Sequence, residues 1–209
     1  MFSLKKHFDN LPWFLYDRIR EAELAHDRGI DCREKGEFAE GMRHFQRVLD
    51  LLSGLGPVST KFSLRRYSLV AAAHNYHGMI ELDQDHCTAA CPAFDRAIAL
   101  RRELLGLFPA ERPNQIYLGG ALCNRGHATA DDDPQSAAGY YQESLRVLRQ
   151  PMNSCECGYW DEERQSWWCE QLEAISQMDA RLKWVELAPR FIDNAMAGLR
   201  SLQPPSAAE

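Results

Sequence analysis

The chain has 209 residues, of which 45% are apolar and 26% charged, and its formal net charge is −6. This length and apolar content predict one folded domain with a substantial core and exclude general disorder. The negative net charge, with basic residues interspersed among acids, excludes the electrostatic footprint expected of a protein that binds nucleic acid or an anionic membrane surface.

The first residues, from Met1 to His7, meet charge too early to build the apolar core of a secretory signal. No later stretch reaches about 18 uncharged apolar residues, so we expect no membrane span. We therefore expect a cytoplasmic location. The seven cysteines are an odd number, and most are expected to be reduced thiols.

In chain order, the pattern predicts helix after helix. Apolar residues recur at steps of three and four over residues 38–52 and again over 69–80, which gives each segment one apolar stripe. No stretch alternates with a period of two for long enough to predict a strand. The segments are separated by residues that break helices, namely Gly36, Pro57, Pro109 and Pro134.

The second half of the chain continues the helical pattern with one long interruption. Asp131, Asp132 and Asp133 precede Pro134 and are interpreted as the N-terminal cap of a helix. The irregular stretch 151–160 separates the third helical pair from the fourth. We expect residues 1–203 to form a single helical domain and residues 204–209 to be a disordered tail.

A repeated order of small and large residues is the strongest signal in the sequence. A small residue is followed after eleven or twelve positions by a second one, after four more by a bulky residue, and after three more by another small or branched one. Small residues let two helices cross closely, and the bulky side chain fills the space beside the crossing. The four units, about 48 to 50 residues apart, are Gly29, Gly41, Phe45 and Val48; Gly78, Ala90, Phe94 and Ala97; Gly126, Ala137, Tyr141 and Ser144; and, more faintly, Ser176, Ala188, Ile192 and Ala195.

Residues 35–45 and 137–145 resemble the tetratricopeptide repeat, whose helical hairpins place a glycine in the first helix and an Ala-x-x-x-Phe pair in the second. Glycine stands here at position 41 in place of the alanine, and tyrosine at 141 in place of the phenylalanine. The resemblance implies an all-α, right-handed α-solenoid of about four antiparallel helical hairpins. The family repeat has about 34 residues, so these helices are expected to be longer, and a HEAT-like helical array is the competing architecture.

The resemblance also implies a function. The first helices would line a concave face that binds a protein or peptide partner, which makes the chain an adaptor or scaffold and not an enzyme. The alternative for each groove position is an ordinary solvated or inter-helix side chain. Helical spacing directs these candidate peptide-binding residues toward the groove: His26, Arg33, Asn75, Met79, Cys123 and His127.

Two other groups of residues carry alternatives. Cys155, Cys157 and Cys169 favour a metal- or thiol-responsive regulatory protein as the second hypothesis, although no complete metal site is predicted. Phosphate-binding loops, nucleophile elbows and HExxH patterns are absent from the sequence, so we expect no catalytic residues and no cofactor. A tryptophan group either packs the fourth pair against the third or forms a patch for self-association into a homo-oligomer. It comprises Trp160, Trp167 and Trp168.

Overall fold

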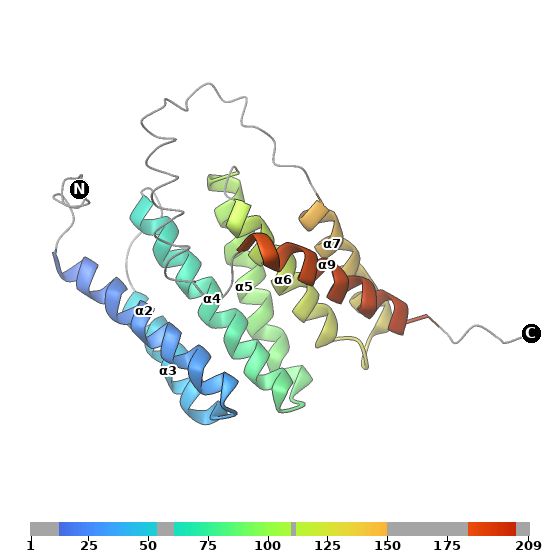
Figure 1. Cartoon of the computed structure of the whole chain (residues 1–209), viewed down its shortest axis with the longest axis horizontal. Coiled ribbons are helices and arrows are strands. Elements are labelled where there is room, and N and C mark those ends of the chain that lie inside the picture. Colours follow the sequence, from blue (N-terminus) through green and yellow to red (C-terminus); the bar gives the residue numbers. More distant parts are fainter. Residues whose placement is uncertain (1–12, 54–60, 110–111, 150–183, 204–209) are drawn as a thin grey trace, which may run out of the picture.

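The computed structural model describes residues 13–53, 61–109, 112–149 and 184–203 (Figure 1). Within these ranges the chain forms seven helices and no strand, which confirms the predicted all-α class. In chain order they are α2 (Trp13–Glu34), α3 (Phe38–Leu52), α4 (Lys61–Asp83), α5 (Cys87–Leu107), α6 (Arg112–His127), α7 (Pro134–Arg149) and α9 (Trp184–Ser201). None of these helices combines the length and the apolarity needed to cross a lipid bilayer.

The helices associate in consecutive pairs. The most extensive contacts join α2 to α3, α4 to α5 and α6 to α7. Each later pair lies against the preceding one, because α4 contacts both α2 and α3, and α6 contacts both α4 and α5. The first helices α2, α4 and α6 therefore lie next to one another in that order, as Figure 1 shows.

The turns inside the first two pairs have the same backbone structure. After α2, the N–H of Glu37 donates to the carbonyl of Cys32 at 2.8 Å, and Gly36 adopts a φ of +77°. After α4, the N–H of His86 donates to the carbonyl of Glu81 at 2.8 Å, and Asp85 adopts a φ of 61°. Both are helix C-terminal motifs in which one left-handed residue closes the last turn. Gly36 was predicted as a helix break, whereas Asp85 carries no such signal in the sequence.

A glycine faces an aromatic ring in each of the three described pairs. A Cβ atom built at Gly29 would lie 2.7 Å from the ring of Phe45. The corresponding distances are 2.7 Å from Gly78 to Phe94 and 2.6 Å from Gly126 to Tyr141. The three glycines thus occupy equivalent environments, as the repeated spacing predicts, and each permits an approach between helices that no other residue allows.

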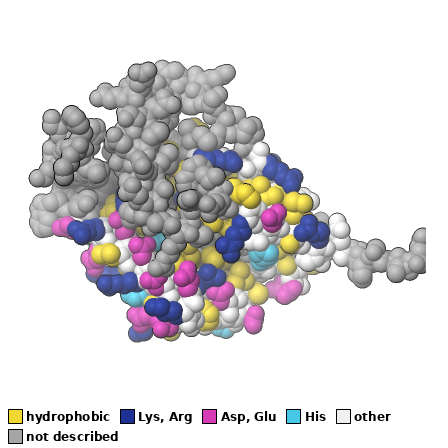
Figure 2. Space-filling view, viewed as in Figure 1, with side chains coloured by type: hydrophobic (Ala, Val, Ile, Leu, Met, Phe, Trp, Pro, Cys, Tyr) yellow, Lys and Arg dark blue, Asp and Glu magenta, His cyan; other side chains and the backbone are white. Residues whose placement is uncertain are grey.

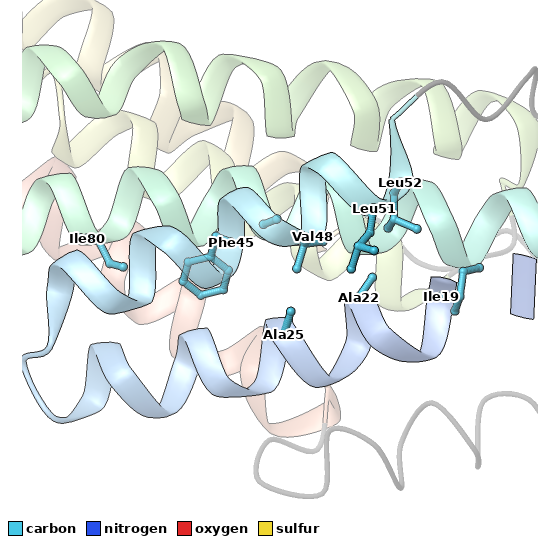
Figure 3. Packing of buried hydrophobic residues seen from close by; sticks show 9 residues of the cluster. Ile19, Ala22, Ala25, Phe45, Val48, Leu51, Leu52 and Ile80 are labelled. Atoms are coloured by element: carbon cyan, nitrogen blue, oxygen red, sulfur yellow. The ribbon is translucent and has the colours of Figure 1, made fainter. Parts of the chain in front are cut away.

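The first pair shows how these contacts build a core (Figure 3). Phe45 lies fully buried between α2 and α4, where its ring stacks on that of Tyr76 with centroids 5.3 Å apart. Burial of such a side chain contributes about 1.5–3 kcal/mol to stability. The buried residues of this cluster are Ile19, Ala22, Ala25, Phe45, Val48, Leu51, Leu52, Ala73 and Ile80.

Helix α9 packs against the third helical pair. The fourth repeat would make Ala188, Ile192 and Ala195 part of a second helix, paired with a first helix around Ser176, which lies outside the described residues. In the structure α9 contacts both α6 and α7, just as α4 contacts α2 and α3. A Cβ at Gly120 of α6 would lie 2.7 Å from the ring of Phe191, so α9 lies directly on the third pair. Its contacts with the third pair therefore resemble those of α4 with the first pair.

Candidate functional site

The ends of the three first helices surround a shallow cleft that is open to solvent. Its volume is about 390 Å³, which is at the lower end of the range for small-molecule sites. It is lined by Arg33, Met79, Leu82, Asp83, Asp85, Cys87, Asn124 and His127. Three predicted groove residues, one from each of α2, α4 and α6, therefore meet in one place: Arg33, Met79 and His127.

Helical periodicity explains why these residues share a surface. Met79, Leu82 and Asp83 are three and four positions apart and project from one side of α4 near its end. Asn124 and His127 have the same relation in the last turn of α6. Since α4 lies between α2 and α6, the last turns of all three helices face the same cleft.

An ion pair fixes one wall of the cleft. Arg33 Nε donates to Asp83 Oδ2 at 2.6 Å, and Arg33 Nη2 donates to Asp83 Oδ1 at 3.0 Å. The two side chains are 24% and 32% exposed, so solvent screens only part of this attraction. The bidentate geometry links α2 to α4, and the carboxylate of Asp83 offsets the positive charge of Arg33.

A hydrogen-bonded amide pair joins α4 to α6 beside the cleft. The side-chain N–H of Asn124 donates to Asn75 Oδ1 at 3.2 Å. Asn75 Nδ2 lies 3.4 Å from the sulfur of Met79. Asn75, a predicted groove residue, therefore does not line the cleft but positions two residues that do.

His127 lies over buried groups of the third pair. Its Nδ1 is 2.8 Å from the hydroxyl of Tyr141, and its Nε2 is 3.5 Å from the sulfur of Cys123. His127 remains partly exposed at the surface, and partial burial of its ring lowers its pKa, so the imidazole is neutral near pH 7. In this neutral form one ring nitrogen is a donor and the other an acceptor, and the two face the Tyr141 hydroxyl and the Cys123 sulfur.

Cys123 is the predicted groove residue least accessible to a ligand, since it is 1% exposed. Burial raises its pKa to about 12. The sulfur is consequently a neutral thiol near pH 7, without the thiolate on which nucleophilic attack or metal binding depends. Its contact with His127 holds the imidazole ring in place.

His26 lies apart from the cleft, in the first core. Its ring makes edge contacts with Phe45 and Tyr76, with centroids 5.9 and 5.4 Å away. Its Nε2 is buried and has no hydrogen-bond partner among the described residues. The structure thus brings five of the six predicted groove residues to the cleft or its immediate support and leaves His26 outside it.

A second, adjoining hollow was not predicted. Its volume is about 640 Å³. It is lined by Asp85, His86, Cys87, Thr88, Ala89, Ala128, Asp131 and Asp132. Because Asp85 and Cys87 line both depressions, the two are neighbours. The predicted cap is confirmed at Asp133, whose Oδ1 accepts the N–H of Ser136 at 3.0 Å, whereas Asp131 and Asp132 face the hollow.

Further features bear on the metal, self-association and nucleic-acid hypotheses. In the described ranges, no three His, Cys, Asp or Glu side chains are grouped so that they could hold a metal ion. The cysteine group of the second hypothesis and the three tryptophans lie outside the described residues. On the face seen in Figure 2, acidic and basic side chains are interspersed where grey atoms do not cover them.

Comparison of the chain with protein-family models and with curated proteins finds no match.

Proposed function

We propose that the chain is a tetratricopeptide-like adaptor that binds a protein or peptide segment in the cleft between the last turns of α2, α4 and α6. The proposed architecture is a right-handed solenoid of antiparallel helical hairpins. Equivalent glycine contacts in three pairs, and the same C-terminal motif 49 residues apart at Gly36 and Asp85, support it. Such an array presents its first helices on one concave face.

The observation that carries the proposal is the meeting of Arg33, Met79 and His127 in one cleft. These residues come from three successive pairs, so the cleft exists only when the pairs are stacked. Its lining combines apolar surface with an amide and a neutral imidazole. This mixture suits a peptide, because apolar side chains supply contact area and polar groups orient the bound backbone.

The test uses a display library of random peptides selected against the full chain. Selected peptides are expected to bind the unmodified protein and to lose about tenfold or more in affinity when Met79→Ala and Leu82→Ala are combined, since both contacts are removed. The matched control combines Leu24→Ala with Leu107→Ala. These two leucines are 52% and 48% exposed and lie outside the cleft.

Thermal unfolding of each variant checks that the fold is retained, and the single change Met79→Ala serves if the double variant is too unstable. Failure to select any peptide would contradict the proposal. Selected peptides that bind the cleft variant and the leucine control equally well would also contradict it.

A further inference from the structure

The cleft and the adjoining hollow form one interrupted depression with an apolar floor. Met79 and Leu82 are partly buried against the cluster of Ala90, Phe94 and Ala128 and still line the cleft or its edge. Ala128 itself also lines the hollow. The depression therefore offers apolar contact along both of its parts, on either side of Asp85 and Cys87.

The walls of this depression carry an excess of negative charge. Its one arginine, Arg33, is engaged by Asp83 at 2.6 Å. Asp85, Asp131 and Asp132 are exposed, and none of them forms an ion pair with a residue that the structure describes. The end of α4 and the start of α5 meet here, so their opposite helix dipoles offset each other and the side chains set the local charge.

Neighbouring titratable groups do not cancel that charge. His127 is held neutral by the burial described above. His86 Nδ1 lies 3.0 Å from a carboxylate oxygen of Glu81, which is not one of the three aspartates that line the depression. The thiol of Cys87 responds to the same field: its pKa is raised first by burial and then by Asp131, Asp85 and Asp132.

We infer that the depression binds a basic peptide segment, with a Lys or Arg side chain in the hollow lined by Asp85, Asp131 and Asp132 and a neighbouring apolar side chain on Met79 and Leu82. The inference rests on the proposed function and specifies its ligand. Charge complementarity selects the peptide: the carboxylates that line the hollow attract a basic side chain, while an acidic segment would meet like charge. The long aliphatic stem of lysine or arginine also matches a depression that has apolar surface beneath its charged rim.

The test measures fluorescence anisotropy of three labelled peptides of equal length with blocked termini. In these peptides leucine alternates with lysine, with glutamine or with glutamate. The lysine peptide is expected to bind the full chain most tightly and the glutamate peptide least. Raising the salt concentration should weaken only the lysine peptide, because screening acts on exposed charge pairs.

The decisive variant combines Asp131→Asn with Asp132→Asn, which leaves the capping residue Asp133 in place. It should weaken the lysine peptide about fivefold to tenfold, the effect of losing two exposed charge pairs. The control combines Asp17→Asn with Asp193→Asn, which makes the same change of net charge at exposed positions on α2 and α9. The control should bind like the unmodified chain.

The outcomes separate this inference from the proposed function. If all three peptides bind equally, and only the Met79 and Leu82 truncations weaken them, the preference for basic segments is overturned and the peptide-binding cleft stands. Equal loss in the Asp131/Asp132 variant and its control would likewise overturn the preference. If spermidine displaces the lysine peptide completely at a matched charge concentration, the depression is a general cation site and the peptide assignment falls. If no peptide binds, both proposals fail.

Discussion

In each described pair, one glycine lies against an aromatic ring of the partner helix and lets the two helices come close. At Gly78, a methyl group would lie 2.7 Å from the ring of Phe94, which is fully buried and has little room to move. We predict that Gly78→Ala lowers the free energy of unfolding by about 1–3 kcal/mol, because the overpacked ring must shift or leave its preferred rotamer. Urea unfolding of the variant and the unmodified chain measures the difference.

The control is Gly139→Ala on α7, where an added Cβ meets nothing within 4 Å. That change should raise the free energy of unfolding by about 0.5–1 kcal/mol, since alanine is the better helix former at an exposed position. Stabilisation by both substitutions would show that the Phe94 contact does not constrain the helices. A partial rescue of Gly78→Ala by Phe94→Leu would locate the strain at this ring.

The sequence predicts the contact between Gly78 and Phe94, because the contact depends only on the size of two residues and on the spacing between them. Gly78 and Phe94 are separated by the same interval as Gly29 and Phe45, and side-chain volume is a local property that survives the change of surroundings. The position of His26 could not be predicted in the same way. Helical periodicity assigns it to a groove, but the rings of Phe45 and Tyr76 close over it, and that contact depends on how two pairs stack.

At the scale of the elements, helices α2 and α4 are each followed by one residue in the left-handed conformation. Gly36 has a φ of +77° and nothing within 4 Å of an added Cβ. We predict that Gly36→Ala lowers the free energy of unfolding by about 1–2 kcal/mol through backbone strain alone, because side chains are disfavoured in this conformation. Chemical denaturation provides the measurement.

Gly106→Ala, near the end of α5, is the matched substitution at an exposed glycine that has equally empty surroundings but no positive φ. It should leave stability unchanged or raise it slightly. Equal losses at both positions would rule out the conformational explanation.

The two turns also show why the ends of helices can be predicted only in part from the sequence. Gly36 indicates a left-handed position in the sequence, because glycine adopts this conformation readily. At the equivalent position 85 the residue is aspartate, which tolerates the conformation less well and gives no clear signal in the sequence. The fourth repeat stays a prediction, because its first helix around Ser176 lies outside the described residues. The contacts of α9 with α6 and α7 place it on the third pair, and residue spacing alone does not reveal that contact.

At the scale of the whole molecule, the candidate site depends on stacking between pairs. Helical spacing was sufficient to choose Arg33, Met79 and His127, because each lies on the expected side of its own helix. It could not select Asp85, Asp131 or Asp132, which belong to turns. Their place beside the cleft follows from the backbone path between helices, and a run of acids before Pro134 is explained equally well as a cap.

Stability should depend on pH through histidines in two different pairs. Burial lowers the pKa of His74 to about 4, helped by the positive charge of Arg96 and by His77. Burial also lowers the pKa of His77 and His127. The unfolded chain takes up these protons near pH 6.5, the ordinary value for histidine, while the folded chain resists protonation until the pH is lower.

Between these two values the unfolded state binds more protons, so the free energy of unfolding must fall as the pH falls. We predict full stability above about pH 7 and a progressive loss from about pH 6.5 toward pH 4. His74→Gln should flatten this decline, and His74→Gln combined with His77→Gln should flatten it further, because each substitution removes a group that protonates more readily in the unfolded chain. Urea unfolding at intervals over this range measures both slopes. A decline in the His74→Gln variant that runs parallel to that of the unmodified chain would show that His74 is not the group responsible.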